Sequence, residues 1–313
     1  LWNHGGASDD IHRQGRRVVG ILTPVSRYFA GLLEMASGMH PRPGKAAVLY
    51  RRGSGFGRLA ARGAEARAAQ AGVSVAALTY SSVRDDLPKL VSKLQRLGPD
   101  IVLSAGALED ECALARGFVG AGVTAKAFAL TAAAMREFGV ALGTQAEGFL
   151  GPSQWEPGAG YAADFGPDPR EAARRIRAMG ASVDYPAAQA YAACLIAQRC
   201  LEEADVVDDE ALWRAACALD CTTFFGRFKI DPRTGLQVGH DMMWVQWQGG
   251  KKFIVWPPTL AQAAPANTGA SGFPLSRAIQ ASSWRAGPTP QQTSRSCSPH
   301  GGRRRRSRRH RRT

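Results

Sequence analysis

A glycine-rich loop near the start of the chain carries residue types that can bind an anion. From Gly5 to Asp10 the sequence reads Gly-Gly-Ala-Ser-Asp-Asp. Two glycines before a Ser/Asp helix start can expose backbone N–H groups and one hydroxyl to a carboxylate. The same residues are typical of an ordinary helix start, with Ser8 or Asp9 as the capping side chain. The residues alone leave both interpretations open.

A second glycine-rich stretch, Gly53-Ser54-Gly55-Phe56-Gly57, lies between a predicted strand and a predicted helix. A dinucleotide-binding fingerprint would lie here, but the spacing is GxGxG rather than GxGxxG. The next predicted strand ends in Thr79-Tyr80 rather than in the acid that binds a ribose, and the chain has no P-loop motif. We therefore predict a tight strand-to-helix turn, which directs Phe56 toward whatever lies over the strand ends.

The other chemistry-bearing side chains form no recognisable catalytic or metal-binding set. No GxSxG elbow is present, and the acidic run Glu109-Asp110-Glu111 is more typical of a first helical turn than of a general acid–base pair. No partner at the spacing of a metal site, such as HxxxH, accompanies His4, His12, His40 or His240. We predict no metal, no cofactor and no enzyme activity.

The six cysteines contain no CxxC pair. We expect most of them to pack as small apolar side chains in helices. A disulfide between Cys217 and Cys221, or between Cys194 and Cys221, stays open because spacing alone does not decide it.

Alternating strands and helices must position these loops. Near-continuous apolar runs predict buried parallel strands at 18–22, 45–50, 74–80, 100–104 and 126–131. Helical periodicity fills the gaps at 56–71, 86–97 and 108–121. This order predicts a doubly wound α/β fold.

The pattern changes after Trp155. Helices are expected near 169–179, 185–204 and 208–219, and Gly249-Gly250 between two apolar runs predicts a closing antiparallel hairpin.

The charge of the chain is concentrated at its end. The net charge is +14, but residues 266–313 hold eleven arginines and no acid. Removing those eleven from the 40 basic residues leaves 29 against 26 acidic ones, so residues 1–265 are close to neutral. The tail has a composition too polar and too rich in Gly, Pro and Ser to form a core, and we expect it to be disordered and to bind nucleic acid only non-specifically.

Several stretches then resemble the periplasmic ligand-binding proteins of the branched-chain amino acid class, the type I family that serves ABC importers. The resemblance spans roughly residues 1–260. It rests on the order and spacing of segments rather than on one motif: 18–24, 53–57, 183–193, 223–231, 235–239 and 245–247.

The resemblance implies two doubly wound lobes that close on a ligand. It places 1–40 and 160–220 in the N-terminal lobe, 41–159 and 221–265 in the C-terminal lobe, and 266–313 in a tail without a family counterpart. Family members usually carry about a hundred residues before the position of Leu1, so we expect an incomplete N-terminal lobe and an N-terminally truncated or frameshifted product.

The resemblance also assigns a binding site. Gly6, Ala7 and Ser8 would hold a ligand carboxylate, while Phe56 and Tyr185 would form aromatic walls. Thr131 stands where the family has the acid that binds an amino group, and Ala107 stands where an aromatic residue is expected. Both differences weaken the argument for an α-amino acid and make other carboxylates, amides or aromatic acids plausible ligands.

The expected function is therefore the non-enzymatic, periplasmic solute-binding component of an ABC importer, which binds an amino acid or a related small carboxylate or amide between two lobes, with the transporter permease as its partner. Two alternatives stay open: an α/β enzyme that uses a nucleotide cofactor, and a non-functional fragment whose arginine-rich tail binds nucleic acid.

Overall fold

The computed structural model describes residues 1–13 and 17–266. The predicted tail, apart from its first residue, and Cys297 lie outside the described residues. Within those ranges, no helix combines the length and the apolar character that crossing a membrane requires.

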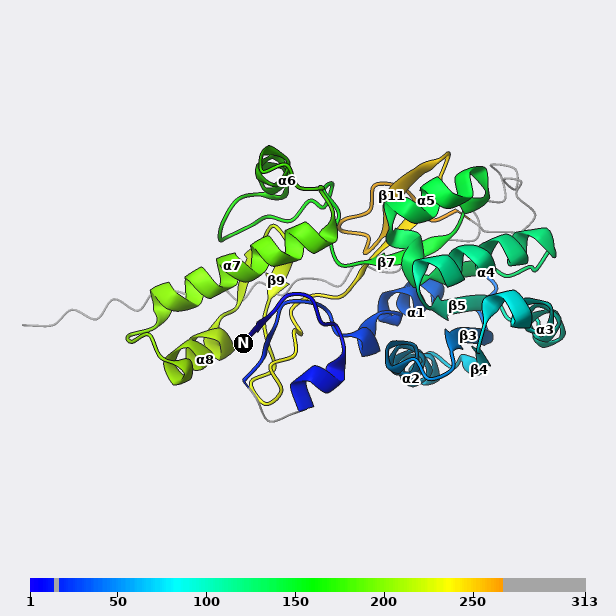
Figure 1. The fold of residues 1–313 in the computed structure, drawn as a ribbon, viewed down its shortest axis with the longest axis horizontal. Coiled ribbons are helices and arrows are strands. Elements are labelled where there is room, and N and C mark those ends of the chain that lie inside the picture. The colour runs from blue at the N-terminus through cyan, green and yellow to red at the C-terminus, as the bar shows by residue number, and fades with distance from the viewer. Residues whose placement is uncertain (14–16, 267–313) are drawn as a thin grey trace, which may run out of the picture.

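A seven-stranded sheet forms the core of the body on the right of Figure 1. Its strands are β3 (Lys45–Arg51), β4 (Ser74–Tyr80), β5 (Ile101–Ala105), β6 (Ala127–Leu130), β7 (Leu150–Ser153), β10 (Met243–Gln248) and β11 (Lys251–Trp256). The spatial order is β11-β10-β7-β6-β5-β3-β4. Because β3 pairs in parallel with both β4 and β5, the chain winds outward in both directions from β3. This confirms the predicted doubly wound α/β class.

Helices cover both faces of this sheet, which explains its near-continuous apolar strands. On one face lie α1 (Ala30–Ala36) and α2 (Gly55–Gln70). On the other lie α3 (Val83–Leu97), α4 (Leu108–Gly120) and α5 (Arg136–Leu142). Neighbouring residues of one strand contribute to opposite cores, as Ile101 and Val102 do.

The turn before α2 forms as predicted. Gly53 has a φ of 84°, and the Ser54 side chain accepts a hydrogen bond from the Gly57 amide at 2.9 Å. A side chain at Gly57 would lie 2.6 Å from the Cβ of Tyr50, so this glycine lets α2 approach the sheet closely. Helix α3 begins three residues earlier than predicted at Val83, because Asp86 accepts hydrogen bonds from the Ser81 and Ser82 amides instead of starting the helix itself.

The second body, on the left of Figure 1, is mainly helical. It contains α6 (Pro169–Ala178), α7 (Tyr185–Glu203) and α8 (Asp209–Ala218). Short strands pack with them: β1 (Trp2–Asn3) pairs in parallel with β2 (Val19–Gly20), and β8 (Cys221–Thr223) pairs with β9 (Gly226–Phe228) in antiparallel. Their shared core includes Trp155 and Phe224.

Strand lengths in this second body differ from expectation. The apolar run 18–22 forms only the two-residue strand β2, because the Gly20 amide donates to the Gly235 carbonyl oxygen and the chain then leaves for the other body. The segment that follows α8 bends at Phe224-Phe225 into a hairpin. The sequence does not predict α1, α5 or β7, because each is too short to show a clear periodic pattern.

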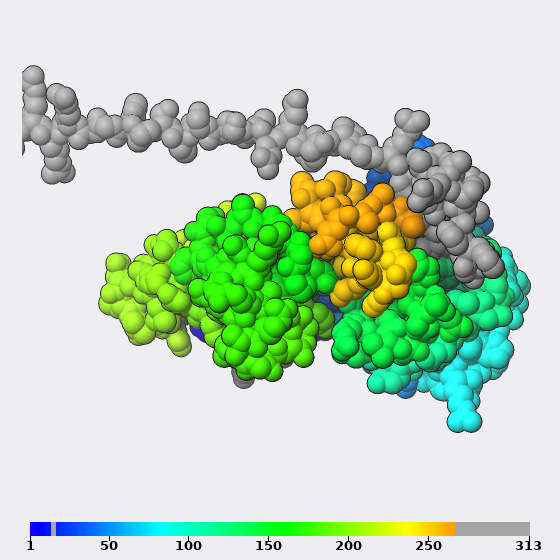
Figure 2. Space-filling model, turned by 90° about the horizontal axis from the view of Figure 1, so that it is seen from above, coloured from blue at the N-terminus to red at the C-terminus, as the bar shows by residue number. Residues whose placement is uncertain are grey.

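Three segments cross between the two bodies: the first joins β2 to α1, the second follows β7, and the third precedes β10. In Figure 2, the gold to orange atoms of β10, β11 and the segment after them lie at the surface, next to the boundary between the two bodies. The predicted lobe bounds stay a prediction, and we propose two changes to them. Residues 30–36 would belong to the C-terminal lobe, because they pack on the large sheet. Residues 221–228 would belong to the N-terminal lobe, because they pack with α7.

Candidate functional site

A cavity of about 160 Å³ opens where the parallel strands of the large sheet end. Ligands of open α/β sheets bind at this carboxyl edge, next to the point where the strand order reverses. Alanine, methionine and proline side chains make up much of the lining. The remaining lining residues are Tyr28, Phe56, Gly106, Thr131, Gln154 and Tyr185.

The structure brings three of the predicted site residues together here. Phe56 comes from the start of α2, Thr131 directly follows β6, and Tyr185 is the first residue of α7 in the other body. Ala107 is not a lining residue; it is the exposed N-cap of α4, directly after the lining residue Gly106. The cavity is therefore bounded by both bodies.

The predicted carboxylate loop is not among the lining residues. The Gly6 amide donates to the Asn3 side-chain oxygen at 2.8 Å, and the Ala7 carbonyl oxygen accepts from the Val25 amide at 2.8 Å. The Ser8 hydroxyl lies 3.4 Å from the Asp10 amide, as an N-terminal cap would. In this arrangement Gly6 and Ser8 hydrogen-bond within their own turn.

One wall of the cavity is aromatic. The rings of Tyr28 and Phe56 meet edge to face, with centroids 5.6 Å apart. The Tyr28 hydroxyl accepts a hydrogen bond from the Gln154 side-chain amide at 3.2 Å, so its own proton can be donated into the cavity. Burial raises the pKa of Tyr28 to about 12, and the tyrosine stays a neutral donor over the ordinary pH range.

A buried carboxyl group contacts the lining residues Thr131 and Ala132 without lining the cavity itself. Glu111, in the first turn of α4, is fully buried; one carboxyl oxygen lies 3.0 Å from the Thr131 hydroxyl, and the other accepts from the Ala132 amide. Burial raises the pKa of Glu111 to about 8, although these hydrogen bonds act in the opposite direction. The sequence had indicated only a helix start for Glu111.

Sequence reasoning missed several of these residues for different reasons. Gly106 and Gln154 directly follow strands β5 and β7, and the rule that ligands bind at the carboxyl ends of parallel strands would have found them. Tyr28 lies on the crossover before α1, and no local pattern marks it.

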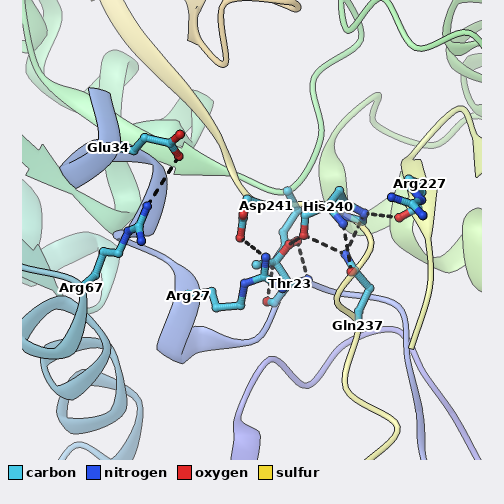
Figure 3. Close-up of polar contacts among 9 residues, drawn as sticks. Thr23, Arg27, Glu34, Arg67, Arg227, Gln237, His240 and Asp241 are labelled. Atoms are coloured by element: carbon cyan, nitrogen blue, oxygen red, sulfur yellow. Dashed lines mark hydrogen bonds and ion pairs between the residues drawn. The ribbon is translucent and has the colours of Figure 1, made fainter. Parts of the chain in front are cut away.

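Polar side chains connect the three crossovers beside the cavity. Gln154 accepts from the Thr23 amide at 3.1 Å and donates to the Thr23 carbonyl oxygen at 3.0 Å. The Thr23 hydroxyl donates to the carbonyl oxygen of His240, and Arg27 pairs with Asp241 at 2.7 Å (Figure 3). The first crossover is thus hydrogen-bonded to both of the others.

Neither a metal-binding group nor a disulfide is found in the described ranges. No group of His, Cys, Asp or Glu side chains within 1–13 and 17–266 could hold a metal ion. Cys112, Cys194, Cys200, Cys217 and Cys221 are free, so neither disulfide that the sequence left open is formed.

Two α/β bodies, joined by three crossovers and bounding a cavity at the carboxyl edge of a parallel sheet, define the class of two-lobed ligand-binding proteins. The family described as "Periplasmic binding protein" matches residues 25–252. The chain belongs to this family, which is one of solute-binding proteins, and the predicted resemblance is confirmed.

Solved structures share the fold. A leucine-binding protein from Thermotoga maritima has a TM-score of 0.67 at 15% identity, covering 81% of this chain and 71% of its own. A putative branched-chain amino acid ABC transporter protein from Rhodospirillum rubrum has 0.69 at 16%, covering 81% and 72%. A solute-binding protein from R. palustris in complex with benzoate has 0.62 at 15%, covering 88% and 74%.

Proposed function

We propose that the chain is the periplasmic solute-binding component of an ABC importer and that it binds a small carboxylate or carbonyl compound in the cavity described above. The observation that carries the proposal is the convergence of Phe56, Thr131 and Tyr185 on one cavity between two bodies. The closing of two lobes would remove the ligand from water and strengthen its few polar contacts.

The lining favours a compact ligand with an apolar part. Aromatic rings and the side chains of Met135 and Met242 offer apolar contact, while the hydroxyls of Tyr28, Thr131 and Tyr185 offer hydrogen bonds. Of the described residues that line the cavity, none has a charged side chain. A flat aromatic acid fits this chemistry better than an α-amino acid, whose ammonium group would need an acidic partner.

The partner would be the membrane permease of the importer, and we propose no catalytic step. The role of Gly6, Ala7 and Ser8 in holding the carboxylate stays a prediction. The alternative of a nucleotide-dependent enzyme has weaker support, because Ser54 caps α2 within the glycine-rich turn and the neighbouring cavity has a volume of only about 160 Å³.

A first prediction tests the site with benzoate as the probe. Titration calorimetry of the full chain should show benzoate binding that Phe56→Ala weakens about tenfold, because one aromatic contact contributes roughly 1 kcal/mol or more beyond its buried area. Met179→Ala, at an 85% exposed side chain on the C-terminal end of α6, is the matched control and should bind as the unmodified chain does.

Equal benzoate affinity in the Phe56→Ala variant would place binding elsewhere. Binding of an adenine dinucleotide in place of benzoate would favour the enzyme alternative.

A further inference from the structure

Thr131 has one hydroxyl proton and several groups that compete for it. Its Oγ1 lies 3.0 Å from a carboxyl oxygen of Glu111 and 3.4 Å from the Gly106 carbonyl oxygen, and it accepts from the Gly106 amide at 3.3 Å. A hydroxyl donates one hydrogen bond and accepts up to two. The direction of the contact with Glu111 therefore decides what Thr131 offers to the cavity.

The Ala132 amide fixes how the Glu111 carboxyl group can be protonated. This backbone N–H donates to one carboxyl oxygen, so that oxygen must remain an acceptor. A proton on the group then belongs on the other oxygen, which faces Thr131. The neutral carboxyl group donates to Thr131, whereas the ionised carboxylate accepts from Thr131.

We propose that Glu111 is a specificity-determining positioning residue that acts on the ligand through Thr131. With Glu111 neutral, Thr131 accepts from it and donates its own proton to a carboxylate or carbonyl oxygen of the ligand. With Glu111 ionised, Thr131 gives that proton to the carboxylate and offers only a lone pair, which suits a ligand N–H. The inference rests on the ligand site proposed above.

The surroundings of Glu111 favour its neutral form at pH 7. The residue is fully buried, and the titratable groups near it include Tyr80 from β4 and Cys112 from its own helix. Desolvation has a larger effect on its pKa than the hydrogen bonds from Ser104 and Gly106, which favour the ionised form. Asp110 is already paired with Arg51, at 2.9 Å, so that arginine is committed to another carboxylate. Since desolvation raises the pKa of Glu111 to about 8, the site at pH 7 selects an acceptor-bearing ligand, a carboxylate or carbonyl compound.

Benzoate and benzamidine test the proposal because they share a shape but differ in hydrogen-bond direction; they also differ in charge, which the Thr131→Val variant below separates from hydrogen bonding. Benzoate affinity of the full chain, measured by calorimetry, should fall up to about tenfold from pH 7 to pH 9, while benzamidine affinity rises. In Glu111→Gln the Ala132 amide orients the side chain so that its NH₂ group donates to Thr131. At pH 9, this variant should therefore still prefer benzoate to benzamidine to the extent that the unmodified chain does at pH 7.

Two controls separate this mechanism from general effects. Glu109→Gln, at an exposed acid of the same helical turn, should keep the wild-type pH profile. Thr131→Val should weaken benzoate binding about tenfold at pH 7 but little at pH 9, where the hydroxyl already points to Glu111. If charge alone caused the pH dependence, this substitution would weaken benzoate binding equally at both pH values.

Two results would overturn the inference while leaving the proposed function intact: a flat wild-type benzoate profile from pH 7 to pH 9, or a Glu111→Gln profile as steep as that of wild type. If neither probe binds to the unmodified chain at any pH, the proposed ligand chemistry of the cavity is wrong and the inference fails with it.

Discussion

At the residue scale, the absence of a side chain at Gly63 allows α2 to contact the first crossover. A Cβ at Gly63 would lie 1.8 Å from the carbonyl oxygen of Ser26. Ser26 cannot move freely, because its hydroxyl donates to Asp9 at 2.6 Å and its amide donates to the same carboxylate at 3.2 Å. Gly63 thus permits a backbone contact that also positions Tyr28, two residues further along the crossover.

Gly63→Ala should destabilise the protein by about 2 kcal/mol or more, because overpacking against the backbone outweighs the gain in helix propensity. Urea unfolding followed by circular dichroism measures the change. Gly120→Ala, at a helical glycine with open space around it, is the control and should be neutral or slightly stabilising. Equal stability of the two variants would contradict the close approach.

At the element scale, aspartates begin the helices of the second body. The side chains of Asp168, Asp184 and Asp208 each accept a hydrogen bond from a backbone amide in the first turn, at 2.8, 3.1 and 2.7 Å. Capping satisfies amides that have no partner inside the helix, and the negative charge favours the helix N-terminus. The cap at Asp184 also fixes where Tyr185 enters the cavity.

Asp208→Ala should lower the free energy of unfolding by about 1 kcal/mol, since the N-terminal amides of α8 lose their cap. Asp208→Asn should retain most of the stability, because the amide oxygen still accepts. Asp209→Ala, one residue inside the helix, provides the comparison in urea unfolding. A cost for Asp209→Ala as large as that for Asp208→Ala would assign the effect to charge rather than to capping.

At the scale of the whole molecule, the crossovers are held together by Gln154. Its amide pairs with both backbone groups of Thr23 and reaches the Tyr28 hydroxyl, so one side chain connects the second crossover with the first and with the cavity wall. Gln154 is 3% exposed, and water does not readily replace these hydrogen bonds.

Gln154→Leu should destabilise the protein by roughly 1–3 kcal/mol, because the backbone N–H and C=O of Thr23 lose buried partners. Urea unfolding measures this change, with Gln198→Leu on the exposed face of α7 as the control. Unchanged stability would show that Gln154 does not hold the crossovers together.

The amino-acid sequence by itself determined the alternation of strands and helices and the class of the fold. Strands β3 to β6 and helices α2, α4 and α6 to α8 lie close to their predicted positions, because periodicity and turn residues are local properties. The sequence also directed Phe56 toward the strand ends, whereas Thr131 was indicated by the family resemblance alone; both follow parallel strands that end at one edge of the sheet.

Only the tertiary structure decided which side chains complete the cavity. Tyr28, Gln154 and Tyr185 come from crossovers and from a second body, so their meeting depends on contacts between segments far apart in the sequence. Glu111 has the sequence pattern of a helix start, yet the packing of α4 against residues 131–134 removes its carboxyl group from water. Burial, unlike periodicity, depends on what the rest of the chain places around a residue.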